Sequence, residues 1–89
     1  MTVGDFAERL ALVALVVPCS VTSWGRSAKH NAAPDVAGHP DSWHRLWLGA
    51  DVVLDSPADT ESFARQCTRL GLRVLNEGDH IHVQPLAPG

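Results

Sequence analysis

The sequence predicts an α+β domain in which a small antiparallel sheet is flanked by two helices. Three observations predict it: an apolar pattern of helical period near the N-terminus, a second such pattern after Pro57, and short β-branched runs bounded by turn residues. The order helix, strand, loop, strand, helix, hairpin shows no internal repeat. With 89 residues the chain has the length of one compact domain, which we expect to span residues 1–89.

The first predicted element is a helix from Val3 to about Val17. Its alanines favour a helix, and apolar side chains recur at helical spacing. The predicted buried stripe comprises Phe6, Leu10, Val13 and Val17. Pro18 ends this helix, because proline cannot continue the helical hydrogen-bond pattern.

A short strand and a long loop follow. The β-branched residues Val21 and Thr22, followed by Trp24, predict the strand. Residues 27–41 contain Ser, Asn, Pro, Asp, Gly and His without a clear period, which is typical of a surface loop. Loops of this length in small domains often carry function.

The next segment predicts a strand and a second helix. The strand spans Gly49 to Leu54, and Asp55-Ser56-Pro57 then supplies an N-cap and a first-turn proline. The buried stripe of the helix is predicted to comprise Phe63, Cys67 and Leu70. Gly71 stops the helix.

The chain is predicted to end in a hairpin. Its strands run from Leu72 to Leu75 and from His80 to Gln84, joined by a turn at residues 76–79. His80 and His82 are two positions apart in the second strand, so we expect their side chains to point to the same face.

Composition excludes several classes of function. Apolar residues make up 45% of the chain and charged residues 19%, which fits neither a disordered nor a membrane protein. The net charge is −3 and the basic residues are scattered, so nucleic acid is not an expected partner. Cys19 and Cys67 form no CxxC pair, so we expect two buried free thiols rather than a cysteine metal site.

The apolar run Leu10–Val17 does not predict an export signal or a membrane anchor. Asp5 and Glu8 occupy the place of the positive region of a signal peptide, and Pro18 before Cys19 departs from the cleavage pattern. The run is also shorter than the ~20 residues that a bilayer-spanning helix needs. We therefore expect synthesis in the cytoplasm without membrane attachment.

Histidine is abundant, with five residues in the chain. His30 and His39 lie in the predicted loop, where each alone is expected to be structural or exposed. His44 and Asp51 are seven positions apart, and Asp51 begins an apolar strand where an acid requires a partner. Two imidazoles and one carboxylate, with a fourth position for water, are typical of a catalytic zinc site. The alternative is that Asp51 caps a turn and His44 is solvated.

Motifs in separate segments carry a family resemblance. The segments are Thr22-Ser23-Trp24-Gly25-Arg26-Ser27, His30-Asn31, Ser42-Trp43-His44 with Gly49-Ala50-Asp51, and Asp79-His80-Ile81-His82-Val83. In this order they resemble the zinc peptidases that include D-Ala-D-Ala carboxypeptidases and phage L-Ala-D-Glu endolysins. That family, which shares its fold with the Hedgehog signalling domain, carries an SxHxxGxAxD motif and a later carboxylate three residues before a second histidine.

The resemblance implies a role for each matching residue. His44, Asp51 and His82 match the zinc ligands, and Asp79 matches the catalytic carboxylate. In such enzymes Zn²⁺ activates a water molecule, and the carboxylate takes its proton. Arg26 matches an arginine that binds a substrate carboxylate or the oxyanion through bidentate hydrogen bonds. Further substrate contacts are implied for Ser42 and His80.

The sequence departs from the family motif at Trp47 and Gly49, where the family has glycine and alanine. The ligand spacing is preserved, but an indole must find room beneath the site or face outward. The tryptophans, Trp24, Trp43 and Trp47, are expected to pack in the core or at the rim of the site.

The carboxylate and histidine pair has two possible registers. Glu77 precedes His80 by three residues, and Asp79 precedes His82 by the same interval. We favour Asp79 with His82, because the residues after His82 match the strand ending of the family. Glu77 with His80 is the alternative.

Two functional hypotheses follow. The first is a zinc metallopeptidase that hydrolyses peptide bonds in peptidoglycan stem peptides, a substrate class implied by the resemblance alone. The second is a non-catalytic zinc-binding module, which would have no need of Asp79. For the enzyme we expect a monomer that reaches the cell wall by phage-like release through a holin, with neither nucleic acid nor membrane as a partner.

Overall fold

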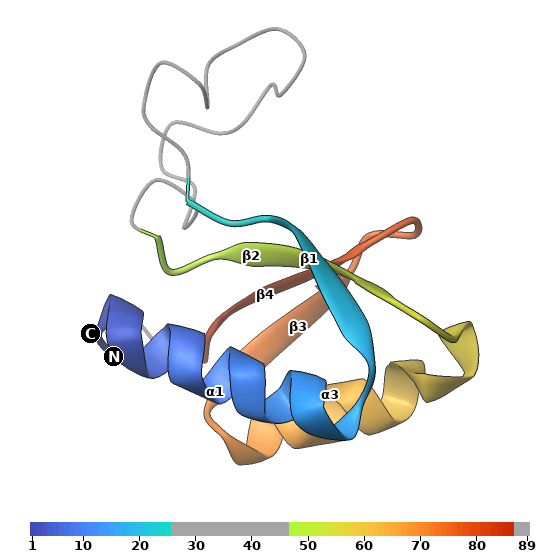
Figure 1. The fold of residues 1–89 in the computed structure, drawn as a ribbon, viewed down its shortest axis with the longest axis horizontal. Coiled ribbons are helices and arrows are strands. Elements are labelled where there is room, and N and C mark those ends of the chain that lie inside the picture. The colour runs from blue at the N-terminus through green and yellow to red at the C-terminus, as the bar shows by residue number, and fades with distance from the viewer. Residues whose placement is uncertain (26–46, 87–89) are drawn as a thin grey trace, which may run out of the picture.

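The computed structural model describes residues 1–25 and 47–86. Its elements in chain order are α1 (Val3–Val16), β1 (Cys19–Ser23), β2 (Ala50–Leu54), the 3-10 helix η2 (Pro57–Asp59), α3 (Thr60–Arg69), β3 (Leu72–Asn76) and β4 (Ile81–Pro85). Within the described residues, the strands form one antiparallel sheet of order β1-β2-β4-β3, and α1 and α3 lie along one of its faces (Figure 1). The α+β class and the small antiparallel sheet with two helices are confirmed.

Helix α1 begins at a capping box. The Thr2 hydroxyl accepts a hydrogen bond from the Asp5 amide at 3.0 Å, and the Asp5 carboxylate accepts one from the Thr2 amide at 3.2 Å. The buried side chains are those of the predicted stripe, namely Phe6, Leu10, Val13 and, just after the helix, Val17.

No helix in residues 1–25 or 47–86 combines the length and apolar character needed to cross a membrane.

Helix α3 begins later than the sequence predicts. Pro57 opens η2, Ser56 makes no capping hydrogen bond through its side chain, and the α-helix starts at Thr60. Because Pro57 fixes φ and needs no amide partner, it suits the first turn of either kind of helix. Ser56 is thus the N-cap residue and Pro57 the first helical residue, as predicted, but of η2 rather than of the α-helix, whose N-cap is Asp59. Gly71 ends the helix with a left-handed φ of +76°, as predicted.

The buried stripe of α3 is narrower than predicted. Phe63 and Cys67 are fully buried, whereas Leu70 is only partly buried. The Leu70 carbonyl accepts a hydrogen bond of 2.9 Å from the Arg9 guanidinium, which ties the end of α3 to α1.

Burial raises the pKa of the Cys67 thiol to about 12, and Cys19 is only partly buried. Both thiols are free, but the prediction that both are buried holds for Cys67 alone.

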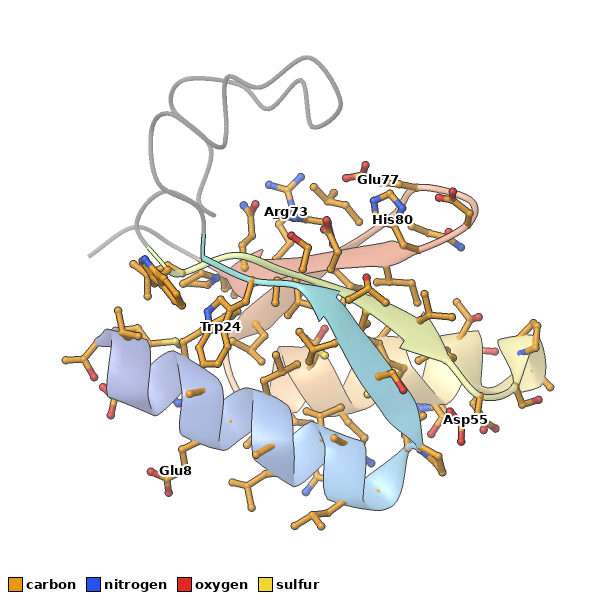
Figure 2. The ribbon with its side chains drawn as sticks, turned by 45° about the horizontal axis from the view of Figure 1, so that its top comes forward. Glu8, Trp24, Asp55, Arg73, Glu77 and His80 are labelled. Atoms are coloured by element: carbon orange, nitrogen blue, oxygen red, sulfur yellow. The ribbon has the colours of Figure 1, made fainter. Side chains whose placement is uncertain are left out.

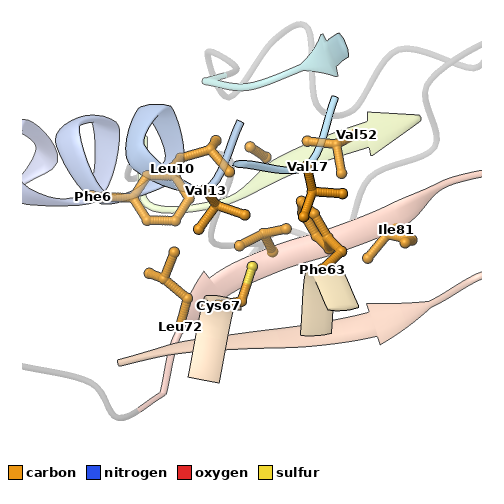
Figure 3. Packing of buried hydrophobic residues seen from close by; sticks show 11 residues of the cluster. Phe6, Leu10, Val13, Val17, Val52, Phe63, Cys67, Leu72 and Ile81 are labelled. Atoms are coloured by element: carbon orange, nitrogen blue, oxygen red, sulfur yellow. The ribbon is translucent and has the colours of Figure 1, made fainter. Parts of the chain in front are cut away.

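The register of the central strands sorts their side chains between two faces. Ala50 pairs with Val83, Asp51 with His82 and Val52 with Ile81. Because successive residues of a strand point to opposite faces, the apolar members meet the helices and Asp51 and His82 point away from them. Figure 3 shows the resulting core, which comprises Phe6, Leu10, Val13, Val17, Ala50, Val52, Phe63, Cys67, Leu72, Ile81 and Val83. We call the side opposite the helices the outer face, and it carries Asp51, His80, His82 and Gln84.

Candidate functional site

Asp51 and His82 form a cross-strand pair at the centre of the outer face. They are directly opposite in the β2–β4 register, and the Asp51 Oδ1 and His82 Nδ1 atoms are 3.2 Å apart. Among the described residues, His82 is the only buried polar or charged residue, with 8% of its surface exposed. A buried polar residue requires partners, so its position is more informative than that of an exposed one.

Gln84 contacts the other ring nitrogen of His82. Gln84 follows two positions later on the same face of β4, and its Oε1 lies 2.9 Å from His82 Nε2. A hydrogen bond from Nε2–H to Gln84 leaves two arrangements for Nδ1: it carries a second proton and donates to Asp51, or a cation lies between it and the carboxylate. Metal-binding histidines commonly donate their second ring N–H to an oxygen in this way.

The separation of Asp51 Oδ1 and His82 Nδ1 is that of a hydrogen bond and is also compatible with two ligands of one zinc ion. Nitrogen and oxygen ligands lie about 2.0–2.1 Å from a tetrahedral Zn²⁺, so two of them are about 3.3–3.4 Å apart. The observed distance is 3.2 Å. No group of three His, Cys, Asp or Glu side chains able to hold a metal occurs in residues 1–25 and 47–86. The third predicted ligand, His44, lies outside the described residues.

His80 lies among carboxylates at the end of the outer face. Its Nδ1 is 2.6 Å from Asp79 Oδ1, and its Nε2 is 3.3 Å from Glu77 Oε2 and 3.9 Å from Asp51 Oδ1. The hydrogen bond with Asp79 raises the pKa of His80, and the nearby charges of Asp51, Asp79 and Glu77 act in the same direction. Figure 2 shows His80 and Glu77 at the β3–β4 turn, on the side away from the helices.

The two candidate carboxylates lie at different edges of this imidazole. Asp79 contacts Nδ1, and 90% of its side chain is exposed. Glu77 shares the Nε2 edge with Asp51. The structure therefore brings Asp51, His80 and His82 together, with Glu77 on the same edge of His80 as Asp51 and Asp79 on the other. Of the remaining predicted residues, Arg26 and Ser42 lie outside the described part of the chain.

The departure from the family motif at Trp47 coincides with an unusual backbone conformation. Trp47 has a φ of +59°, a left-handed conformation that favours glycine, and glycine stands at this position of the motif that the sequence resembles. The Trp47 indole is half exposed and packs against Trp24 with ring centroids 6.0 Å apart, while the Trp47 carbonyl accepts a hydrogen bond of 2.9 Å from Trp24 Nε1–H. Trp24 packs against the core, as predicted, whereas Trp47 contacts Trp24 and stays half exposed. Trp43 lies outside the described residues.

Gly25 gives the Trp47 indole its space. A Cβ added at Gly25 would lie 1.8 Å from Trp47 Cδ2, which is far inside van der Waals contact. We expect Gly25→Ala to lower the free energy of unfolding by about 1–3 kcal/mol, as overpacking does. In a Trp47→Gly background, which removes the ring and suits the left-handed backbone, the same change should cost less than about 1 kcal/mol. Urea unfolding of the four proteins in this double-mutant cycle measures the difference. Equal costs in both backgrounds would contradict the contact.

The contact between Gln84 and His82 is not among the sequence predictions. The alternation of His80, His82 and Gln84 is the signal that could have revealed it, because residues two apart in a strand share a face.

Comparisons of the chain with protein-family models, with curated proteins and with solved structures gave no match.

Proposed function

We propose that this chain is a zinc-dependent peptidase that hydrolyses peptide bonds in peptidoglycan stem peptides. Its motifs resemble those of D-Ala-D-Ala carboxypeptidases and L-Ala-D-Glu endolysins, and we extend the proposal to their Hedgehog-like fold. The observation that carries the proposal is the Asp51–His82 pair, two ligand types of a catalytic zinc site held 3.2 Å apart by strand register. A monomer that acts at the cell wall after release from the cytoplasm is part of the same proposal.

His44, Asp51 and His82 would hold the zinc ion in this proposal. Bound zinc would lower the pKa of a water molecule and polarise the substrate carbonyl. Gln84 supports the assignment of His82, because its Oε1 lies 2.9 Å from Nε2 and can hold the ring with Nδ1 toward Asp51. The outer face also concentrates negative charge, since Asp51, Glu77 and Asp79 all approach His80, and this charge favours a cation nearby.

Asp79 is the proposed general base. Its carboxylate lies 2.6 Å from His80 Nδ1, on the imidazole whose Nε2 is 3.9 Å from Asp51 Oδ1. Glu77 is the alternative base, because it shares the Nε2 edge of His80 with Asp51. Substrate contacts are proposed for Arg26, Ser42 and His80.

The left-handed backbone at Trp47 supports the alignment with the family motif. Glycine stands at this position in the family, and a φ of +59° is the conformation for which glycine is favoured.

A non-catalytic zinc-binding module is the second candidate function. The observation that favours it is the hydrogen bond between Asp79 and His80, which gives Asp79 a structural role without catalysis.

Matched carboxylate variants test the base and separate the two functions. For zinc-loaded protein on purified sacculi, we expect Asp79→Asn to lower the rate of hydrolysis by about 10²–10⁴-fold, the usual contribution of a general base. Its zinc content should not change. Glu77→Gln and the helix-surface control Glu61→Gln should retain activity within a few-fold. Mass spectrometry of the released fragments gives the rate and identifies the bond that is cut.

The other outcomes of this experiment are equally informative. Loss of activity in Glu77→Gln with retention in Asp79→Asn would move the base to Glu77. Zinc binding by the wild-type protein without any hydrolysis would favour the non-catalytic module. Absence of stoichiometric zinc binding would remove both functions.

A further inference from the structure

Arg73 lies on the outer face beside the candidate metal site. In the β3–β4 register it is directly opposite Gln84, and the next pair on this face is Leu75 with His82. Gln84 Oε1 is in turn 2.9 Å from His82 Nε2. Diagonal neighbours on two paired strands are about 7–8 Å apart, a distance that a long side chain can span. Arg73 therefore stands within reach of a molecule bound at the Asp51–His82 pair.

Arg73 has the properties of an anion-binding residue. It is exposed, and within residues 1–25 and 47–86 no acidic side chain forms an ion pair with it. Figure 2 shows it on the side away from the helices, like His80 and Glu77. A guanidinium keeps its charge in proteins and offers a rigid fork of N–H donors that matches a carboxylate. The other arginines of the described ranges belong to α1 and α3, namely Arg9, Arg65 and Arg69.

The charge of the outer face changes sign across the Asp51–His82 pair. Glu77 and Asp79 lie on the side of the β3–β4 turn, and Arg73 lies on the other side, near the start of β3. A peptide with one anionic end is therefore oriented on this face. Its carboxylate is attracted toward Arg73 and repelled by the acidic side chains at the turn.

Both substrates of the proposed function have such an end. In D-Ala-D-Ala, the residue after the scissile bond carries the terminal carboxylate. In L-Ala-D-Glu, the stem peptide continues through the γ-carboxyl group of the D-residue, so its α-carboxylate is free. One extended residue spans about 3.3–3.6 Å, so either carboxylate lies about one residue length from the reacting carbonyl.

We propose that Arg73 binds this α-carboxylate and so makes the enzyme selective for a free acid on the leaving-amine side of the bond. The family resemblance implies a substrate contact for Arg26 and none for Arg73. The identity of the carboxylate as that of a stem peptide rests on the proposed function.

Paired acid and amide substrates measure this contact. N-acetyl-D-Ala-D-Ala is compared with its C-terminal amide, and N-acetyl-L-Ala-D-Glu blocked at the γ-carboxyl group is compared with its α-amide. Losing a hydrogen bond to a charged group weakens an interaction by about 10–100-fold. We expect the zinc-loaded wild-type protein to cleave one acid at least 10-fold faster, as kcat/KM, than the matching amide. The pair that is cleaved identifies the bond.

Arg73→Gln should remove the preference for the acid. Its kcat/KM on the acid should fall by about 10–100-fold, whereas that on the amide should stay within a few-fold of the wild type. Arg73→Lys keeps the charge without the bidentate fork and should retain part of the preference. Arg69→Gln is the matched control, because it removes an exposed arginine from α3, and it should keep the full preference. Circular dichroism confirms that the variants fold.

A binding measurement tests Arg73 without hydrolysis. The full chain, ¹⁵N-labelled and zinc-loaded, is titrated with N-acetyl-D-alanine or with N-acetyl-D-alaninamide, and the Nε–Hε signals of its arginines are followed. We expect the acid to shift the Arg73 signal and the amide to leave it in place. The Arg69 signal should stay in place with both compounds.

The outcomes separate this contact from the peptidase. Hydrolysis with the same ratio of acid to amide rates in the wild type and in Arg73→Gln overturns the carboxylate contact and leaves the peptidase intact. Equal responses of the Arg73 signal to the two compounds also overturn the contact. An acid-specific shift at Arg73 without any hydrolysis overturns the peptidase and supports the contact.

Discussion

Replacing Asp51 with asparagine is expected to abolish peptide hydrolysis and to weaken zinc binding by more than about 100-fold. Losing an outer-shell partner of a metal typically costs about 10–100-fold in affinity, and a direct ligand should cost more. Asparagine has the shape of aspartate but lacks its charge, and its amide group can hydrogen-bond to His82 Nδ1, which lies 3.2 Å from Asp51 Oδ1 in the native pair. The fold should therefore survive. Competition titrations with a chromophoric chelator measure the affinity.

Asp55→Asn is the control for this change. Asp55 follows β2 directly and Figure 2 shows it away from His80 and Glu77, so the substitution removes the same charge without touching the outer-face cluster. Zinc affinity and hydrolysis should equal those of the wild type. An Asp51→Asn protein that binds zinc as tightly as the wild type would exclude Asp51 as a ligand.

Phe63→Ala is expected to cause a large loss of stability. Phe63 is completely buried on α3, within the core that joins both helices to the sheet. Truncation of a buried phenylalanine to alanine costs about 3–5 kcal/mol, because apolar contacts are lost and a cavity remains. A domain of this length has roughly 4–13 kcal/mol of stability in total. Urea denaturation followed by circular dichroism should therefore show a transition at much lower denaturant concentration, or a chain that is already partly unfolded.

Leu15→Ala is the matched control on α1. Its side chain is 83% exposed, so truncation should change the free energy of unfolding by no more than about 0.5 kcal/mol. Similar losses in Phe63→Ala and Leu15→Ala would show that α3 does not pack on the core as described.

The elements that bury a regular apolar stripe could be predicted from the sequence. In α1 the stripe from Phe6 to Val17 has one period throughout, so propensity and burial indicate the same structure. The strands around Val52 and Val74 were also recognisable, because β-branched residues lie between turn residues there. Their observed limits differ from the predicted ones by one residue each, since β2 begins at Ala50 rather than Gly49 and β3 ends at Asn76 rather than Leu75.

Other features depend on information that local sequence does not contain. Pro57 suits both a 3-10 and an α-helical first turn, so its presence cannot decide where α3 begins. The pairing of Asp51 with His82 depends on strand register, and a slip of one residue would move either side chain to the opposite face. The choice between Asp79 and Glu77 depends on side-chain positions around His80, which spacing alone leaves open.

X-ray absorption spectroscopy of the zinc-loaded wild-type protein examines the metal environment most directly. We expect one Zn²⁺ per chain, surrounded at about 2.0–2.1 Å by nitrogen and oxygen atoms that include two imidazoles, with no sulfur at about 2.3 Å. A protein that takes up no stoichiometric zinc, or a first shell without imidazole, would contradict the assignment of His44, Asp51 and His82 as its ligands.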